Sequence, residues 1–171
     1  MQKKNRSSFA VPLLFGIYLF LLIWIIVFKL SFSLDELYGV RSVNLLPFYY
    51  AYAAGERVHL SEIMNNVAIF VPFGIYLCMF RREPRFGAKL LILAGTSLSF
   101  ELLQYALAIG RTDITDLITN TCGGLLGIAF YHLLAKLLRS RLRTNTVLTV
   151  LAALATCAVV GIVALLLFFN R

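Results

Sequence analysis

Residues 99–127, SFELLQYALAIGRTDITDLITNTCGGLLG, contain two apolar segments that meet at a short polar turn. Charged and amide side chains lie on both sides of this turn: Glu101, Gln104, Arg111, Asp113, Asp116 and Asn120. In a water-soluble protein the stretch would be an ordinary helix-loop-helix. In a membrane, each ionisable group is costly to bury and becomes a candidate functional residue. The rest of the chain decides between these two interpretations.

The composition is that of an integral membrane protein. Of 171 residues, 60% are hydrophobic and 14% are charged, whereas soluble domains are about half apolar and about a quarter charged. The net charge of +8 is spread over several loops, which argues against nucleic-acid binding. The three cysteines, Cys78, Cys122 and Cys157, lack metal-ligand spacing and are interpreted as small buried apolar side chains. No cofactor and no metal site are expected.

Five apolar segments are long enough to cross a bilayer as helices, which predicts an all-α membrane bundle in a single domain, residues 1–171. The predicted spans are 9–30, 65–80, 88–109, 114–138 and 147–169. The first span follows a basic start, as a signal peptide does, but it is longer and lacks a small-x-small cleavage site. Pro72 lies inside the second span, where a membrane helix tolerates it.

Basic residues predict the orientation of the bundle. With the N-terminus inside, segments 1–8, 81–89 and 136–146 are cytoplasmic and hold eleven of the sixteen basic residues against one acid, Glu83. The positive-inside rule therefore favours five helices with the N-terminus in and the C-terminus out. An even number of helices is the main alternative, which would arise if the last segment failed to insert or the first loop re-entered the membrane.

The loop at residues 31–62 is unusually long for a compact protein. Its aromatic residues suit the lipid headgroup region; they are Tyr38, Phe48, Tyr49, Tyr50 and Tyr52. We predict a short interfacial or re-entrant piece over the outer end of the bundle, beginning at Asn44. A lipid-anchored loop with no ligand role is an equal alternative.

Pairs of polar residues share faces on two of the predicted helices. Glu101 and Gln104 are three residues apart in the outer half of the third helix, and Asp116 and Asn120 are four apart at the outer start of the fourth. Glu101 has apolar neighbours about two turns inside its helix, so it must be paired, protonated or directed into a polar cavity.

Further polar residues are predicted at the same membrane depth, on the outer side. Asn65 and Asn66 fall in the first turn of the second helix, and Arg111 falls in the connecting turn, where it can pair with a carboxylate. Asp113 is most simply an N-cap of the fourth helix. A structural polar network is the alternative to a functional site, which we favour. The predicted ligand-binding residues on the outer side are Asn44, Asn65, Asn66, Glu101, Gln104, Arg111, Asp113, Asp116 and Asn120.

Two other features of the predicted helices have structural explanations. Gly123 and Gly127 form a GxxxG spacing in the fourth helix, which lets another helix approach closely. His132 is predicted at the inner interface, and His59 is predicted to be solvated in the outer loop.

Three spaced motifs run through the middle of the chain: Asn44-x-x-Pro47-Phe48, Asn66-x3-Phe70-x-Pro72-x-Gly74 and Glu101-x2-Gln104-x6-Arg111-x-Asp113-x2-Asp116-x3-Asn120. Together they resemble the VanZ-like family of bacterial membrane proteins over roughly residues 42–134, which leaves the first and fifth helices outside. This family takes its name from a protein associated with low-level teicoplanin resistance in Gram-positive bacteria. The resemblance implies a role at the cell envelope, in the plasma membrane, and it assigns no catalytic residues.

Three functions are compatible with this interpretation. In the preferred one, the outer polar site binds a lipid-linked cell-wall precursor or an acylated glycopeptide antibiotic such as teicoplanin. In the second, the chain is an intramembrane enzyme in which Glu101 and Asp116 act as an acid/base pair or hold a divalent metal. The third, a small transporter, is less favoured because there is no internal repeat and the inner halves of the helices offer little beyond loop charges.

Overall fold

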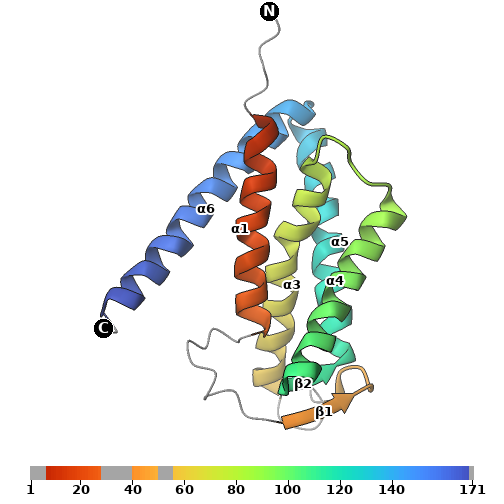
Figure 1. Ribbon diagram of the computed structural model, residues 1–171. Coiled ribbons are helices and arrows are strands. Elements are labelled where there is room, and N and C mark those ends of the chain that lie inside the picture. Colours follow the sequence, from red (N-terminus) through yellow and green to blue (C-terminus); the bar gives the residue numbers. More distant parts are fainter. Residues whose placement is uncertain (1–6, 28–39, 50–55, 170–171) are drawn as a thin grey trace, which may run out of the picture.

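The computed structural model describes residues 7–27, 40–49 and 56–169, which form a helical bundle with a two-stranded sheet at one end (Figure 1). The helices are α1 (Ser7–Val27), α3 (Glu56–Met79), α4 (Phe86–Leu107), α5 (Ile114–Leu137) and α6 (Arg141–Phe169). The strands are β1 (Val40–Asn44) and β2 (Ile109–Asp113). All five of these helices are long and apolar enough to cross a membrane. The predicted five-helix membrane bundle is confirmed.

The bundle has two chemically different ends. The strand end holds β1, β2 and the starts of α3 and α5, and the basic end holds the start of α1, the loop 80–85 and the turn 138–140 (Figure 1). Exposed arginines gather at the basic end: Arg81, Arg82, Arg85, Arg139, Arg141 and Arg143. The positive-inside rule expects this pattern at a cytoplasmic end.

α3 and α5 pack against each other more extensively than any other two helices of the bundle. A Cβ atom on Gly123 would lie 2.2 Å from the carbonyl oxygen of Val67, and one on Gly127 would lie 2.0 Å from that of Val71. Only glycine therefore allows the two backbones to touch at these positions. The GxxxG spacing packs as predicted.

Aromatic side chains fill the space between this pair and its neighbours. Phe70 and Phe73 of α3 are buried, and the ring of Phe73 lies 5.4 Å from that of Phe15 in α1. The hydroxyl of Tyr18 donates a hydrogen bond of 2.6 Å to the carbonyl of Ile69. α1 is thus joined to α3 in the turn before Pro72, where a membrane helix needs neighbouring polar partners.

α6 is the most peripheral helix. It packs on α1 and α5 near the basic end and then diverges from the bundle (Figure 1). Leu148 is buried, but most of the described large apolar side chains of α6 are exposed, among them Leu154 and Ile162. Leu91 on α4 is also exposed. In a membrane protein such surface contacts lipid.

Two helices begin six or more residues earlier than predicted. α3 begins at Glu56 rather than at 65, and α6 begins at Arg141 rather than at 147. Asn65 and Asn66 consequently lie in the third turn of α3, and the prediction that they occupy its first turn is wrong. The added residues mix charged and polar side chains with apolar ones, so they fall outside the continuous apolar runs from which the spans are predicted.

The strand pair is the main departure from the prediction. β1 and β2 run parallel, with Val40 opposite Ile109 and Asn44 opposite Asp113, so Asn44 is the last residue of a strand that was not predicted from the sequence. Arg111 correspondingly lies in β2 and not in a turn. Residues 31–39 and 50–55 of the long loop, which include Tyr38, Tyr50 and Tyr52, lie outside the described residues.

The cysteines are only partly as predicted. Cys78 is buried, whereas Cys122 and Cys157 are exposed on the surfaces of α5 and α6. The prediction of burial is wrong for these two residues because their helix faces are directed outward from the bundle.

Candidate functional site

The strand register places two motif residues directly opposite each other at the strand end. Asn44 Nδ2 donates a hydrogen bond of 3.1 Å to Asp113 Oδ2. The same amide closes the turn after β1, because Asn44 Oδ1 accepts from the backbone N–H of Leu46 at 3.1 Å. Asn44 therefore joins the first loop to the start of α5.

Glu101 of α4 also binds Asp113. Its side chain is almost fully buried, with 3% exposed, and its Oε2 accepts a hydrogen bond of 2.9 Å from the backbone N–H of Asp113. The carbonyl of Glu101 accepts a further bond of 3.2 Å from Thr112 Oγ1. The prediction that Glu101 requires a partner is met by the backbone of β2.

The first turn of α5 completes this arrangement. Asp113 Oδ1 accepts from the backbone N–H of Thr115 at 2.8 Å, which is the predicted N-cap. Asp116 Oδ1 accepts from Asn66 Nδ2 of α3 at 2.7 Å. We call the five residues joined in this way the strand-end cluster: Asn44, Asn66, Glu101, Asp113 and Asp116.

Three of the predicted site residues, Asn65, Gln104 and Asn120, lie outside the strand-end cluster. Gln104 Nε2 donates to the carbonyl of Ile26 at 2.9 Å, and Asn120 Nδ2 donates to Ser97 Oγ at 3.0 Å. Both are buried helix-to-helix links. Asn65 is exposed on α3, and the side chain of Arg111, like that of His59, lies outside what the structure describes.

An exposed apolar segment adjoins the strand-end cluster. The backbone N–H of Phe48 donates to Thr115 Oγ1 at 2.9 Å, which fixes the turn after β1 to the start of α5. Leu45 and Leu46 in this turn are 72% and 62% exposed, and Phe48 and Tyr49 are also exposed. The buried carboxylate of Glu101 and the partly buried side chains of the other cluster residues thus lie beside side chains suited to lipid.

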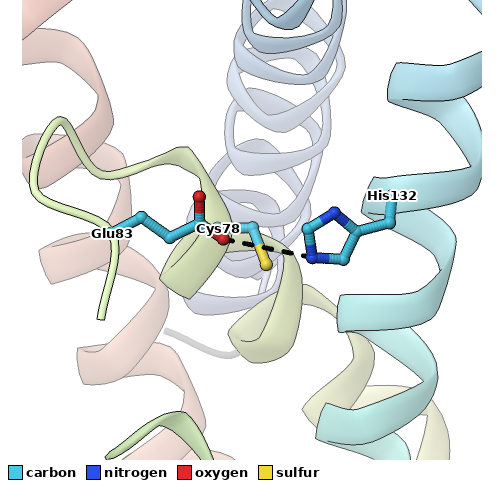
Figure 2. Close-up of side chains that lie close together, drawn as sticks. All are labelled: Cys78, Glu83 and His132. Atoms are coloured by element: carbon cyan, nitrogen blue, oxygen red, sulfur yellow. Dashed lines mark ion pairs between the residues drawn. The ribbon is translucent and has the colours of Figure 1, made fainter. Parts of the chain in front are cut away.

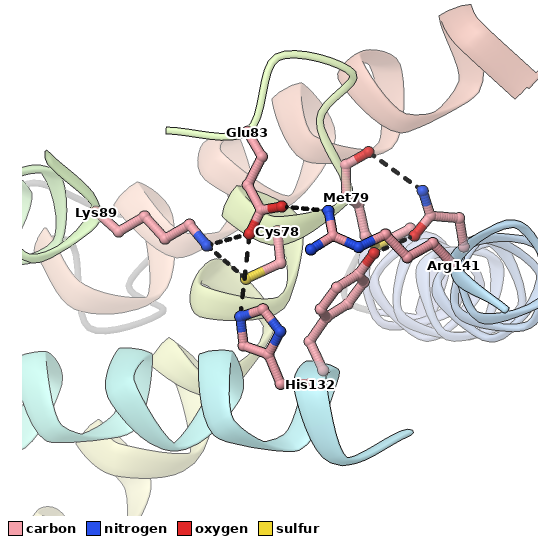
Figure 3. A network of polar contacts seen from close by, with 8 residues as sticks. Cys78, Met79, Glu83, Lys89, His132 and Arg141 are labelled. Atoms are coloured by element: carbon pink, nitrogen blue, oxygen red, sulfur yellow. Dashed lines mark hydrogen bonds and ion pairs between the residues drawn. The ribbon is translucent and has the colours of Figure 1, made fainter. Parts of the chain in front are cut away.

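A second polar group lies at the basic end and was missed by the sequence prediction (Figure 3). Lys89 of α4 is only 3% exposed. Its Nζ forms an ion pair with Glu83 Oε1 and lies 3.1 Å from Cys78 Sγ. Arg141 Nη1 lies 2.7 Å from Glu83 Oε2, and His132 Nε2 lies 4.0 Å from Glu83 Oε1. These five residues form the basic-end cluster.

Glu83 is the centre of the basic-end cluster and the only acid in the basic segments of the sequence. Partial burial alone would raise its pKa, but the hydrogen bonds and charges of Lys89 and Arg141 outweigh this effect and lower the pKa. Beside it, Tyr131 OH donates to Asn145 Oδ1 at 2.8 Å, which links α5 to α6. The expectation that this end offers little beyond loop charges is wrong.

The comparisons with known proteins agree with the motifs. The VanZ/LLP1 family profile matches residues 15–136. The chain is also 43% identical to Protein VanZ of Enterococcus faecium over 125 residues, which are 72% of this chain and 74% of that protein. The chain belongs to the VanZ/LLP1 family. No solved structure matches it.

The VanZ/LLP1 match covers more of the bundle than the motifs indicated. It begins inside α1, earlier than residue 42, and ends at the last turn of α5. It therefore includes both polar clusters except for Arg141, and it leaves α6 outside. The shared unit is the part of the bundle in which α1, α3, α4 and α5 pack together.

Two features of the sequence could have indicated the basic-end cluster. Glu83 is a single acid among eleven basic residues, and Lys89 is the fourth residue of α4, where its long side chain can turn inward. Because the charge count is used only to predict the orientation of the bundle, Glu83 and Lys89 both count as loop charges. Their pairing depends on how α3, α5 and α6 meet, which the sequence pattern does not specify.

Proposed function

We propose that this VanZ-family protein lies in the bacterial plasma membrane with its strand end outward and binds an amphiphile of the cell envelope there. The ligand classes are a lipid-linked cell-wall precursor or an acylated glycopeptide such as teicoplanin, whose name is associated with the family. The observation that carries the proposal is the buried, ordered carboxylate of Glu101 beside an exposed apolar turn.

The polar half of such a ligand suits the strand-end cluster. Three carboxylates and two amides, contributed by the first loop, α3, α4 and α5, meet at one end of the bundle. Hydrogen bonds to Asp113 and Asp116 hold these groups in fixed directions, and a preorganised polar site binds without an ordering cost. Ionisable groups kept at membrane depth commonly mark such sites.

The apolar half of the ligand suits the neighbouring turn. Leu45, Leu46 and Phe48 present apolar side chains next to the cluster, and the backbone of Phe48 is tied to α5. An acyl chain in the outer leaflet can contact this turn while its headgroup reaches the carboxylates. The combination favours an amphiphile over a small polar solute.

Glu101→Gln tests the proposal, because glutamine retains an acceptor oxygen for Asp113 N–H but has no ionisable carboxyl group. In a susceptible host that expresses the protein, we expect the wild-type chain to raise the inhibitory concentration of teicoplanin and Glu101→Gln to abolish that increase. Teicoplanin labelled with a fluorophore should bind the purified wild-type protein in nanodiscs and bind the variant at least about tenfold more weakly, a difference of about 1.4 kcal/mol.

Asn65→Ala is the matched control, because Asn65 is exposed and lies outside the strand-end cluster. It should retain both the phenotype and the binding. Equal teicoplanin phenotypes and affinities for the wild-type chain and Glu101→Gln, at equal expression, would overturn the proposal. A glycopeptide without an acyl chain should bind more weakly than teicoplanin if the apolar turn contributes.

A further inference from the structure

The basic-end cluster contains a set of side chains that the proposed function does not use. Cys78 comes from the last turn of α3, Glu83 from the loop 80–85 and His132 from α5, and the three point toward one another (Figure 2). One donor atom from each, the cysteine sulfur, a carboxylate oxygen and an imidazole nitrogen, lies within 4.8 Å of the other two. Cys78 is buried and His132 is half exposed.

This donor set suits a borderline divalent metal. Sulfur, imidazole nitrogen and carboxylate oxygen are the ligands of zinc sites, with bonds of about 2.0–2.3 Å, so tetrahedral ligands lie roughly 3.5 Å from each other. Glu83 Oε1 and His132 Nε2 are 4.0 Å apart. The three donors lie within 4.8 Å of one another, so a contraction of up to about 1.3 Å would bring them to bonding distance. The half-exposed His132 ring can move by this amount.

The ammonium group of Lys89 already contacts two of these three donors. Lys89 Nζ contacts both Glu83 Oε1 and Cys78 Sγ, while Arg141 holds only the other oxygen, Oε2. Lys89 lies in the first turn of α4, so its flexible stem can instead extend to the headgroup level. An ammonium group and a metal ion would therefore compete for the same two atoms.

We propose that Cys78, Glu83 and His132 form a three-ligand site for a divalent transition metal such as Zn²⁺, which binds in exchange for the ammonium group of Lys89. Water from the exposed side of His132 supplies the fourth ligand. The Cys78 thiol gives its proton to solvent as its sulfur bonds to the metal. One monovalent cation and a neutral thiol are thus replaced by one divalent cation and a thiolate, and the charge among the donors stays the same.

Co²⁺ is the probe, because its bond to a thiolate absorbs in the near ultraviolet and its tetrahedral complexes absorb in the visible. The full-length protein, purified in detergent and stripped with a chelator, should bind one equivalent of Co²⁺ with both absorptions, and Zn²⁺ should displace it. Cys78→Ser should lose the thiolate band. Cys122→Ser and Cys157→Ser are the matched controls and should keep it.

Two further variants decide the outcome even if Cys78→Ser fails to fold. His132→Gln changes a half-exposed residue and should weaken Co²⁺ binding by at least about tenfold, since even outer-shell changes at metal sites cost about 10–100-fold. Lys89→Met removes the competing cation and should tighten binding. Absence of the thiolate band in the wild-type protein, or an unchanged affinity in His132→Gln, would overturn the metal site. Weaker or equal binding in Lys89→Met would overturn the exchange with lysine.

These measurements are independent of the proposed function. They use the purified protein and a metal alone, and the strand-end variant Glu101→Gln should bind Co²⁺ as the wild-type does. Failure of the metal site would leave the teicoplanin assay unaffected, and failure of the teicoplanin assay would leave the metal site unaffected.

Discussion

Glu101 is buried at membrane depth, and its neighbours explain how the bundle tolerates it. Its carboxylate accepts the backbone N–H of Asp113, and bonds of this kind are among the stronger ones that proteins form. The need for a partner could be predicted from Glu101 itself, because an ionisable group among apolar residues is too costly to leave unsatisfied. The identity of the partner could not, since it is a main-chain group.

The adjacent asparagines of α3 provide a test of the strand-end cluster at the residue scale. Asn66→Ala removes the bond to Asp116, and a hydrogen bond to a charged group contributes about 1.5–3 kcal/mol. We expect a lower melting temperature in detergent for Asn66→Ala. Asn65→Ala changes an exposed residue one position away, and its free energy of unfolding should lie within about 0.5 kcal/mol of that of the wild-type. Equal melting of the two variants would show that the bond to Asp116 is not stabilising.

Elements that are distant in the sequence are held together in two different ways, by a close helix pair and by a strand pair. α3 and α5 touch through their backbones at Gly123 and Gly127, which could be predicted because GxxxG is a local spacing. The parallel pairing of β1 with β2 could not, because Asn44 and Asp113 are separated by 69 residues and neither strand has an apolar run of its own. Local periodicity therefore recovers the helices and misses the sheet that positions the cluster.

Gly127→Ala tests the close contact between α3 and α5. The added methyl group would lie 2.0 Å from the carbonyl oxygen of Val71, so the helices must separate, and overpacking of this kind costs about 1–3 kcal/mol. We expect a clear fall in the melting temperature. Gly95→Ala is the control, since nothing lies within 4 Å of a Cβ on Gly95. Similar melting of both variants would contradict close α3–α5 packing.

At the basic end, Glu83 connects the end of α3 with α4 and α6, and its contribution should depend on pH. Because its pKa is lowered from 4.5 by Lys89 and Arg141, its stabilising effect is present above the unfolded pKa and is lost as the pH falls through the folded one. Glu83→Gln should be less stable than the wild-type at pH 7, and the difference should shrink below about pH 4.

The buried Cys78 can report this unfolding. In a chain with Cys122 and Cys157 replaced by serine, a pyridyl disulfide, which reacts with thiols even in acid, should label Cys78 only when the bundle opens. Thermal labelling curves at pH 7 and at acidic pH then compare the wild-type with Glu83→Gln. A constant difference between the two proteins across this range would contradict the role assigned to the carboxylate.

At the scale of the whole molecule, the charge distribution predicts which end faces the outside. In the same background lacking Cys122 and Cys157, cysteine is introduced at Leu46 of the strand end or at Arg139 of the basic end, both exposed. A thiol reagent that does not cross the membrane should label intact cells at position 46 and not at 139. Position 139 should become labelled after the cells are broken. The reverse pattern would contradict the positive-inside prediction.

The parallel strand pair has a consequence for the order in which the protein is made. β1 emerges from the ribosome before α3 and α4, and its partner β2 follows only after both helices have been synthesised. Contacts between such distant segments form late because a long loop must close first. A chain truncated before residue 109 would therefore retain Glu101 but lack both β2 and the Asp113 amide that binds its carboxylate. We expect such a truncated chain to leave the Glu101 carboxylate without its main-chain partner, a costly arrangement within a membrane span.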